Sequence, residues 1–461
     1  MIHQLKKLPF WTVSLLLFTV IAVYFLGHLD MEKTEEKGSF NILLLVGVVL
    51  TVIEVWRVRE RLFGGVRPFH IFITLVSTAI VLFYPYKFKV TFGLSIGLLL
   101  LCLGYGLYRR TFYKPHPIMI VLFVFCFLKL ISTFWATDPL RAFDHIDYYA
   151  FFICLPIVSC FYRVDRADLK SFIYISFFVF LHLLVLTLVI YFFLVNYLHK
   201  PYEAFLSFDK NYLGFFDKGN SFYYIRTIYW SYAPHPSKVA WIFMTVWAMG
   251  AWLWREEKGK IIGIYQLGLY TVLLLIVSLI LQARIAILGI FILLSLFVWV
   301  TLMKQVKSHR VIVLFTIIAF AIGSLVTKEV ITHTSFFKDE GRAKINEATL
   351  LHCQERPFIG GGAGYETQLI HNININLNSL HNEFMTALSD QGFLGLTVLL
   401  FFHILVIHYG LKNRYFLGIY VLLAFIIFNA TEGVMGLPIC IPFFLYCFLP
   451  NKANQGIELT C

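Results

Sequence analysis

The sequence predicts an all-α polytopic membrane protein with about 12–14 transmembrane helices. Its 461 residues are 59% hydrophobic and only 14% charged, whereas soluble domains average about 45–50% apolar and 25% charged residues. The mean hydropathy is +0.77. Apolar runs of roughly 15–25 residues recur between short polar breaks, which is the length that a helix needs to cross a bilayer.

The apolar runs justify the predicted helices one by one along the chain. The first run follows two lysines but has no small-residue cleavage site, so we interpret it as the first span and not as a signal peptide. In chain order, the spans are predicted near Pro9–Gly27, Asn41–Val55, Pro68–Tyr84, Val90–Leu107, Pro117–Trp135, Tyr148–Phe161, Ser171–Val195, Pro236–Trp254, Ile261–Leu281, Ile285–Met303, Val311–Thr327, Phe393–Gly410, Tyr415–Asn429 and Leu437–Pro450.

Basic residues predict the orientation of these spans. The net charge of +12 would suit a nucleic-acid-binding protein, but the Lys and Arg residues stand in short loops between spans. With the N-terminus inside, most of them fall in inside loops, as the positive-inside rule requires. Both termini are therefore predicted to be cytoplasmic. The short outside loops hold only Lys33, Lys37, Lys87, Lys89, Arg141 and Arg284.

Two outside segments, 196–235 and 328–391, are too long to be turns, and loops of such length are usually functional or disordered. Their Arg, His, Gly and aromatic residues differ from the composition of disordered segments. The chain is thus predicted in four parts: N-terminal transmembrane helices 1–116, a transmembrane core 117–327 that includes the outer loop 196–235, a large outer loop 328–391 with short helices, and C-terminal transmembrane helices 392–461.

The large outer loop contains a predicted helix followed by a glycine-rich segment. The helix covers Glu340–Arg356 and ends at Pro357. Four of the five residues from Gly360 to Gly364 are glycines, which permit positive φ angles and close approach of the backbone to a ligand. A flexible hinge is an equally good interpretation of the glycines alone.

A second short helix is predicted over Asn378–Asp390, capped by Asn378 or Ser379 and ended by Gly392. This puts His381 in its first turn, where the positive helix end disfavours an imidazolium ion and attracts an anion. His381 is then a candidate general base, although a lone histidine in a loop is more often a surface residue.

Three basic residues stand where topology does not require them. Arg226 lies on the predicted outer side among aromatic residues. Arg284 lies between two spans with almost no loop, and a charge at membrane depth is a functional candidate, with snorkelling to the headgroups as the alternative. Lys129 lies inside the fifth predicted span and raises the same question.

Metal and disulfide chemistry have little support in the sequence. The eight cysteines are scattered and form no Cys-x-x-Cys pair. Asp138, Asp144 and Asp147 are only loosely grouped, and no Asp-x-Asp motif stands in an outside loop. A Walker motif, a serine nucleophile elbow and a His-Glu-x-x-His motif are all missing. No metal and no cofactor are therefore predicted.

From about Pro117 to Ala430 the chain resembles the O-antigen ligase/polymerase superfamily. The features behind this resemblance are Trp135-Ala-Thr-Asp-Pro-Leu140; Arg226 upstream of His235-Pro236; Ala283-Arg284; Gly341-Arg342 leading to Pro357-Phe-Ile-Gly360; and His381-Asn382, nine residues, then Gly392-x-x-Gly395. The chain departs from the pattern at Ala283, where a serine is usual, in the absence of a glycine between Arg226 and His235, and in its two additional N-terminal spans.

The resemblance implies a bundle like that of the type C glycosyltransferases, located in the bacterial inner membrane with its active site on the periplasmic side. Such a protein transfers a glycan from undecaprenyl diphosphate to an acceptor hydroxyl, which in the ligases belongs to a lipid A-core sugar, with inversion and without a metal. His381 would take the proton of the acceptor. Arg226 and Arg284 would stabilise the diphosphate. The predicted substrate-binding residues are Arg342, Arg356, Gly360, Gly362, Asn382 and His235.

Three alternatives share parts of this pattern. A repeat-unit polysaccharide polymerase and a protein O-oligosaccharyltransferase use the same donor, so donor-side residues do not separate them from a ligase. A polysaccharide exporter without chemistry would need paired charges in several spans and symmetric halves, and the sequence has neither clearly.

Overall fold

A computed structural model describes residues 9–27, 38–63, 68–84, 88–197, 236–281, 283–303, 340–372, 380–433 and 435–449. Every regular element in these ranges is a helix. They are α2 (Phe10–Gly27), α3 (Gly38–Phe63), α4 (Pro68–Phe83), α5 (Phe88–Tyr108), α6 (Pro117–Ile131), the 3₁₀ turn η1 (Ser132–Trp135), α7 (Pro139–Val158), α8 (Arg166–Tyr197), α10 (Pro236–Glu256), α11 (Ile264–Ile280), α12 (Arg284–Met303), α14 (Glu340–Glu355), α15 (Tyr365–Asn372), α16 (Glu383–Lys412), α17 (Phe416–Asn429) and α18 (Cys440–Cys447).

Proline residues mark several helix starts. α4, α6 and α10 begin at Pro68, Pro117 and Pro236, the residues at which their spans were predicted to open. Proline suits the first helical position because its fixed φ is helical and its missing N–H has no partner to lose there. α7 begins at Pro139 for the same reason, well before the span predicted from Tyr148.

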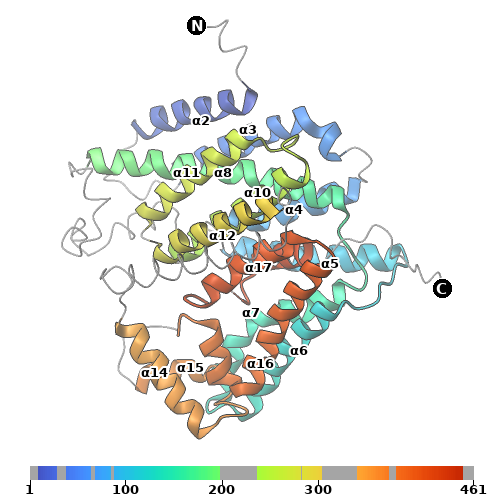
Figure 1. Ribbon diagram of the computed structural model, residues 1–461, viewed down its shortest axis with the longest axis vertical. Helices are drawn as coiled ribbons and strands as arrows, with labels where there is room; N and C mark the ends of the chain where they lie inside the picture. Colours follow the sequence, from blue (N-terminus) through green and yellow to red (C-terminus); the bar gives the residue numbers. More distant parts are fainter. Residues whose placement is uncertain are drawn as a thin grey trace, which may run out of the picture.

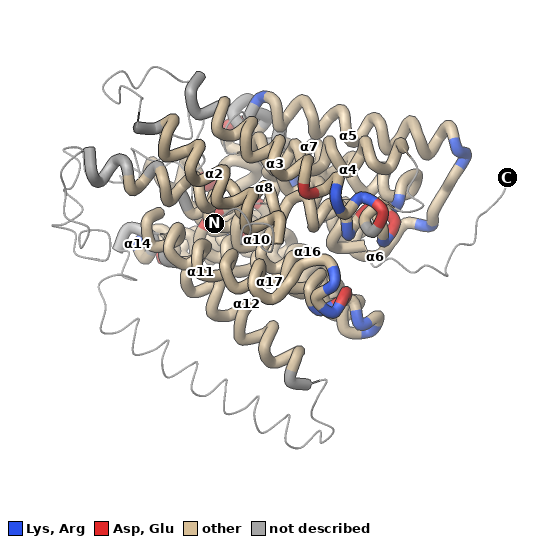
Figure 2. Tube along the Cα trace, turned by 90° about the horizontal axis from the view of Figure 1, so that it is seen from above, with Lys and Arg blue, Asp and Glu red and all other residues tan. Residues whose placement is uncertain are grey.

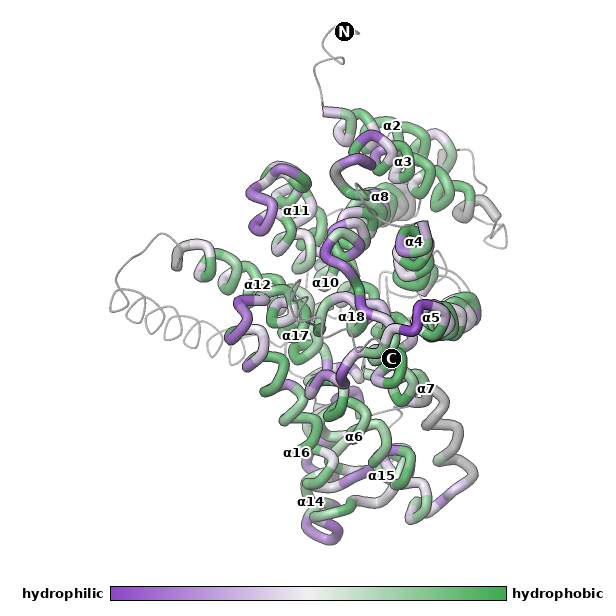
Figure 3. The backbone as a smooth tube through the Cα atoms, turned by 90° about the vertical axis from the view of Figure 1, so that its right-hand side faces the viewer, coloured by the Kyte–Doolittle hydropathy of each residue, from purple (hydrophilic) through white to green (hydrophobic). Residues whose placement is uncertain are grey.

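Within the described residues, four helical segments are long and apolar enough to cross a membrane, which confirms the all-α polytopic class. They are Lys89–Tyr108, Pro117–Trp135, Arg166–Val189 and Glu383–Lys412, and shorter apolar helices accompany them. Figure 3 shows hydrophobic residues along the helix bodies and hydrophilic residues at the helix ends and turns. The predicted span Val311–Thr327 lies outside the described residues.

Helix α8 is the central element of one half of the bundle, and most of its apolar window is buried. It packs against α2, α3, α4, α10 and α11. The other half, in the lower part of Figure 1, consists of α6, α7 and α16 with the short helices α14 and α15 against α16. Segments far apart in the sequence therefore meet at α16.

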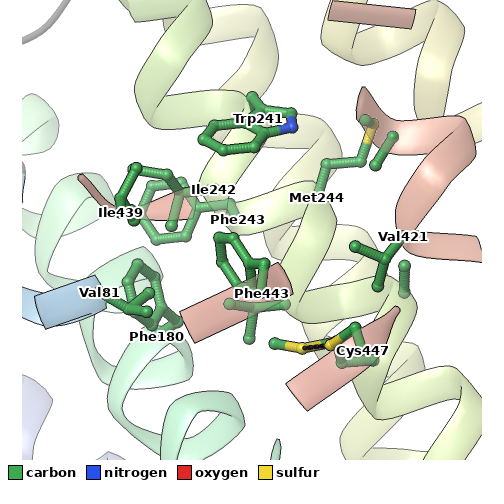
Figure 4. Close-up of a cluster of buried hydrophobic side chains, with 14 of the residues drawn as sticks. Val81, Phe180, Trp241, Ile242, Phe243, Met244, Val421, Ile439, Phe443 and Cys447 are labelled. Carbon is green, nitrogen blue, oxygen red and sulfur yellow. Dashed lines mark hydrogen bonds between the residues drawn. The ribbon is translucent and has the colours of Figure 1, made fainter. Parts of the chain in front are cut away.

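Aromatic and aliphatic side chains pack α17 and α18 against the half of the bundle that is built around α8 (Figure 4). Figure 4 shows side chains from α4, α8, α10, α17 and α18 packed in one cluster. The ring of Trp241 meets Phe425 at 5.0 Å and Phe443 at 5.8 Å, both edge to face, a geometry that aromatic quadrupoles favour.

The first two helices are fixed to the bundle by polar contacts. The His182 ring on α8 lies 3.1 Å from the Ser14 hydroxyl of α2 and 3.4 Å from the Thr51 hydroxyl of α3. Tyr174 on α8 donates to Glu54 on α3 at 3.1 Å. Hydrogen bonds between helices favour association in a membrane, where apolar contacts alone provide little preference.

Charged residues are distributed unevenly over the bundle. Figure 2 shows most of the described Lys and Arg residues at helix ends toward the right of the view. A one-sided distribution of basic residues is the pattern that the positive-inside rule describes.

Candidate functional site

A polar cavity of about 230 Å³ lies at one end of the bundle. It is formed where α6 ends, where α10 and α16 begin, and where the turn after α17 returns toward α18. Its lining combines two lysines, four carboxylates, a histidine and a tyrosine. The lining residues are Lys129, Tyr149, Lys238, Glu366, His381, Asn382, Glu383, Thr386, Asp390, Glu432, Gly433, Met435, Gly436 and Leu437.

The imidazole of His381 is paired with a buried carboxylate in this cavity. Its Nδ1 lies 3.0 Å from Oε2 of Glu432, and the two side chains are 21% and 1% exposed. When Nδ1 carries the proton and donates to Glu432, Nε2 carries the lone pair that accepts a proton. A carboxylate behind an imidazole also stabilises the imidazolium that such an acceptance creates.

The backbone at His381 differs from the predicted one. Asn382, and not Asn378 or Ser379, caps α16, because its Oδ1 accepts hydrogen bonds from the N–H groups of Phe384 and Met385 at 3.0 and 3.2 Å. His381 therefore precedes the helix and does not lie in its first turn, and its φ is +52°. Such a conformation is uncommon for a residue with a Cβ and costs energy that is often found at functional sites.

Glu383, the first residue of α16, forms a second buried hydrogen bond in the cavity wall. Its Oε1 accepts from the Tyr149 hydroxyl of α7 at 2.7 Å, and Glu383 is buried. The bond joins the start of α16 to the middle of α7. It thereby holds the segment next to His381 against the transmembrane bundle.

Lys129 and Asp390 form a buried ion pair deeper in the cavity. The Lys129 Nζ lies 3.3 Å from Asp390 Oδ2, and both side chains are almost fully buried. The same carboxylate accepts from the backbone N–H groups of Gly364 and Glu366 at 3.1 and 3.2 Å, at the start of α15. Asp390 therefore connects the membrane helix α6 to the outer segment. Lys129, the charged residue inside the fifth predicted span, thus has an acidic partner.

The glycine-rich segment is packed against a break in α16. Gly392 has φ +64° and ψ −158° inside that helix, a conformation that is nearly restricted to glycine. Gly361 and Gly362 donate to the carbonyls of Ser389 and Asp390 at 2.8 and 2.9 Å. The predicted end of the short helix at Gly392 is correct, but a further helical stretch follows at once, so the two form one element.

Gly360 and Gly362 have positive φ and touch backbone on their Cβ side. A Cβ at Gly360 would lie 2.6 Å from the carbonyl oxygen of Ser389, and one at Gly362 would lie 2.4 Å from Cα of Ala136. Neither glycine lines the cavity. Their contacts are those of packing positions, and a role in substrate binding stays a prediction.

The helices of the outer segment also pack through a histidine. The predicted helix Glu340–Arg356 is α14, and the His352 ring stacks on Tyr365 of α15 with centroids 4.0 Å apart. Burial lowers the pKa of His352 below its ordinary value, with a smaller contribution of the same sign from Arg356 and an opposing one from Glu355.

The predicted cations are only partly within the described residues. Arg226 and His235 lie outside them. For Arg284, which begins α12, and for Arg342 in α14, the structure describes the backbone but not the side chain. Arg356 is exposed at the end of α14 and does not line the cavity. Of the predicted site residues whose side chains the structure describes, His381 and Asn382 line the cavity, whereas Arg356, Gly360 and Gly362 do not.

Sequence reasoning missed Glu432, Glu383, Asp390, Glu366 and Lys238. For Glu432 a signal existed, because it is the single acidic residue between two C-terminal apolar runs, on the predicted outer side with His381. Glu366, Glu383 and Asp390 stand in the outer loop, where charged residues are ordinary, and Lys238 stands in the first turn of a predicted span, where a lysine can reach the headgroups. Only the fold shows that these four residues converge.

Two comparisons with known proteins bear on this arrangement. Residues 269–400 match the model of a family described as O-antigen ligase. This range includes α14, α15, His381 and the start of α16. No curated protein matches the chain.

Proposed function

Because the chain belongs to the O-antigen ligase superfamily through residues 269–400, we propose that it transfers a glycan from undecaprenyl diphosphate to an acceptor hydroxyl. The observation that supports this most is the His381–Glu432 pair, 3.0 Å apart in the wall of a polar cavity. A base held by a buried carboxylate is what the deprotonation of a sugar hydroxyl needs.

The reaction is a single displacement. The acceptor oxygen attacks the anomeric carbon of the donor while Nε2 of His381 takes the hydroxyl proton. A new C–O bond forms, the bond from the anomeric carbon to the diphosphate oxygen breaks, and that oxygen keeps the electron pair. The configuration at the anomeric carbon is inverted. Glu432 balances the charge of the imidazolium through its bond to Nδ1.

The negative charge on the leaving diphosphate requires fixed cations. Arg226 and Arg284 have this role in the proposal because the planar guanidinium binds phosphate through two parallel hydrogen bonds. Lys238, in the first turn of α10 and on the cavity lining, is a further cation near His381. The proposed step uses these side chains and no metal ion.

The acidic part of the cavity suits the acceptor. Carboxylates accept hydrogen bonds from sugar hydroxyls, and Glu366 and Glu383 line the cavity beside His381. A lipid A-core sugar is the proposed acceptor. Asn382 contributes by capping α16, while Arg342, Arg356, Gly360, Gly362 and His235 are proposed to hold the substrate or the segments around it.

The proposed location is the bacterial inner membrane, with both termini in the cytoplasm and the cavity on the periplasmic side. This orientation follows the distribution of Lys and Arg along the chain. It puts the site where an undecaprenyl-linked glycan and a lipid A-core acceptor are both available.

Reconstitution tests the proposed reaction directly. Purified protein in proteoliposomes is given a radiolabelled undecaprenyl-diphosphate-linked glycan and a lipid A-core acceptor, and products are separated by gel electrophoresis. We expect label on lipid A-core and release of undecaprenyl diphosphate. Label that moves across the bilayer without leaving its carrier would identify an exporter, and longer glycans on the carrier would identify a polymerase.

A further inference from the structure

A second cluster of potential ligand atoms lies away from the cavity. His70 in the first turn of α4, and Asp165 and Asp168 at the start of α8, each place one ligand atom within 4.8 Å of the others. His70 and Asp168 are buried, whereas Asp165 is exposed. A histidine nitrogen and two carboxylate oxygens are a donor set that divalent transition metals accept.

One carboxylate oxygen in this cluster has no hydrogen-bond partner among the described residues. Asp168 is 1% exposed, and its Oδ2 accepts from His70 Nδ1 at 2.5 Å. Its Oδ1 is buried without a donor. Buried polar atoms are nearly always satisfied, so an orphaned carboxylate oxygen calls for a partner such as a bound ion or a water molecule.

The nearby basic residues that could neutralise Asp168 are engaged elsewhere. Arg166 pairs with Glu256 at 2.6 Å, and Lys170 pairs with Glu257 at 2.6 Å. Arg163 donates one guanidinium N–H to the backbone carbonyl of Lys114 at 2.8 Å and stacks on the Tyr113 ring at 4.8 Å, while its Nε has no hydrogen-bond partner among the described residues. Within the described part of the chain, His70 is thus the basic group that contacts the Asp168 carboxylate.

The cluster is remote from the cavity. Tyr113 donates its backbone N–H to Cys160 at 2.6 Å, so the segment leading to Asp165 lies at the start of α6. Lys129 and the cavity lie at the other end of that helix. The 15 residues of α6 rise about 1.5 Å each, so the two ends of this helix, and with them the cluster and the cavity, are about 20 Å apart. The cluster is therefore not part of the site that contains His381.

We propose that His70, Asp165 and Asp168 bind one divalent transition-metal ion of the Zn²⁺ class. Ligand atoms about 2.0–2.2 Å from such an ion lie closer together than 4.8 Å, and the exposed Asp165 side chain has room to close that gap. The ion displaces the proton that His70 Nδ1 shares with Asp168 Oδ2, and this proton passes to water, as metal binding to a protonated ligand requires. The bound ion contacts the orphaned Oδ1 of Asp168 and links the first turns of α4 and α8. Water completes the coordination on the exposed side.

The test uses Co²⁺ as a spectroscopic probe of the whole protein. Tag-free, full-length protein is stripped of metal in detergent and titrated with Co²⁺. We expect visible d–d absorption that saturates at one ion per chain and is abolished when Zn²⁺ is added. Asp165→Asn should weaken the apparent affinity about tenfold or more, because it removes one charged ligand.

The design includes a matched carboxylate control. Glu60→Gln, on the exposed end of α3, should bind Co²⁺ like the wild type. Asp165 is also exposed, so Asp165→Asn is expected to fold, and an unchanged elution volume checks this. The proposal is overturned if the wild type gives no saturable absorption, or if Asp165→Asn binds Co²⁺ as tightly as the wild type.

Discussion

Replacing Glu432 by Gln removes the charge behind His381 with almost no change in shape. The carboxylate is buried, and its Oε2 lies 3.0 Å from Nδ1 of His381. In the proposed reaction the imidazole becomes positively charged as it takes the acceptor proton. Glutamine offers a neutral amide at the same place, so it accepts a hydrogen bond but does not stabilise the imidazolium.

The size of the effect follows from this one contact. A hydrogen bond to a charged group is worth about 1.5–3 kcal/mol. At about 1.36 kcal/mol for each factor of ten in rate, its loss in the transition state lowers kcat about 10- to 150-fold. The KM for the lipid-linked donor should change little, because Glu432 acts through His381 and not on the donor.

Initial rates of glycan transfer in proteoliposomes, measured at several donor concentrations, give kcat and KM separately. Glu355→Gln is the matched control, since Glu355 also stands beside a histidine, 3.7 Å from His352, but is 77% exposed. We expect the control to keep wild-type rates. A Glu432→Gln protein with wild-type kcat would refute the role assigned to this carboxylate.

Three further predictions concern stability. Lys129→Met leaves Asp390 buried without its cation, which should lower the free energy of unfolding by about 3–5 kcal/mol. In a detergent melting experiment, the double variant Lys129→Met/Asp390→Asn should recover part of the lost stability. Gly392→Ala forces an alanine into φ +64° and should lower the free energy of unfolding by about 1–3 kcal/mol. The control Gly97→Ala, on the open side of α5, should be neutral or slightly stabilising. Equal melting temperatures of the two variants would contradict the strained backbone described at Gly392. For His352 the folded state favours the neutral ring, because burial lowers its pKa. The contact between α14 and α15 is therefore fully stable above the unfolded-state pKa of about 6.5 and weakens as the pH falls toward the lower folded-state pKa. Hydrogen exchange of residues 340–372 at two pH values should detect this loss of stability, and His352→Phe should abolish the pH dependence.

The sequence predicts the helices well because apolar runs and helix-starting prolines are local signals. Pro117 and Pro236 mark helix starts without any knowledge of the fold. The start of α16 was not predicted correctly, because Asn378, Ser379 and Asn382 are all good caps. Which of them caps a helix depends on the contacts of the following residues, such as that between Glu383 and Tyr149.

The site was predictable only in part. His381 stands out in the sequence because of its spacing from Gly392 and its position before an apolar run. Its partner Glu432 is distant in the sequence, and their pairing depends on α17 returning the chain to the start of α16. Lys129 raised suspicion as a charge inside a span, but the Asp390 carboxylate that pairs with it could be found only from the fold.

The central claim is that His381 is the general base of glycan transfer. The most direct test is kcat of His381→Ala in the reconstituted transfer assay, at equal amounts of protein in the membrane. His408→Ala, at an exposed histidine of α16, is the control. We predict that His381→Ala lowers kcat by about 10²–10⁴-fold while His408→Ala retains wild-type activity. Transfer by His381→Ala at the wild-type rate would contradict the account.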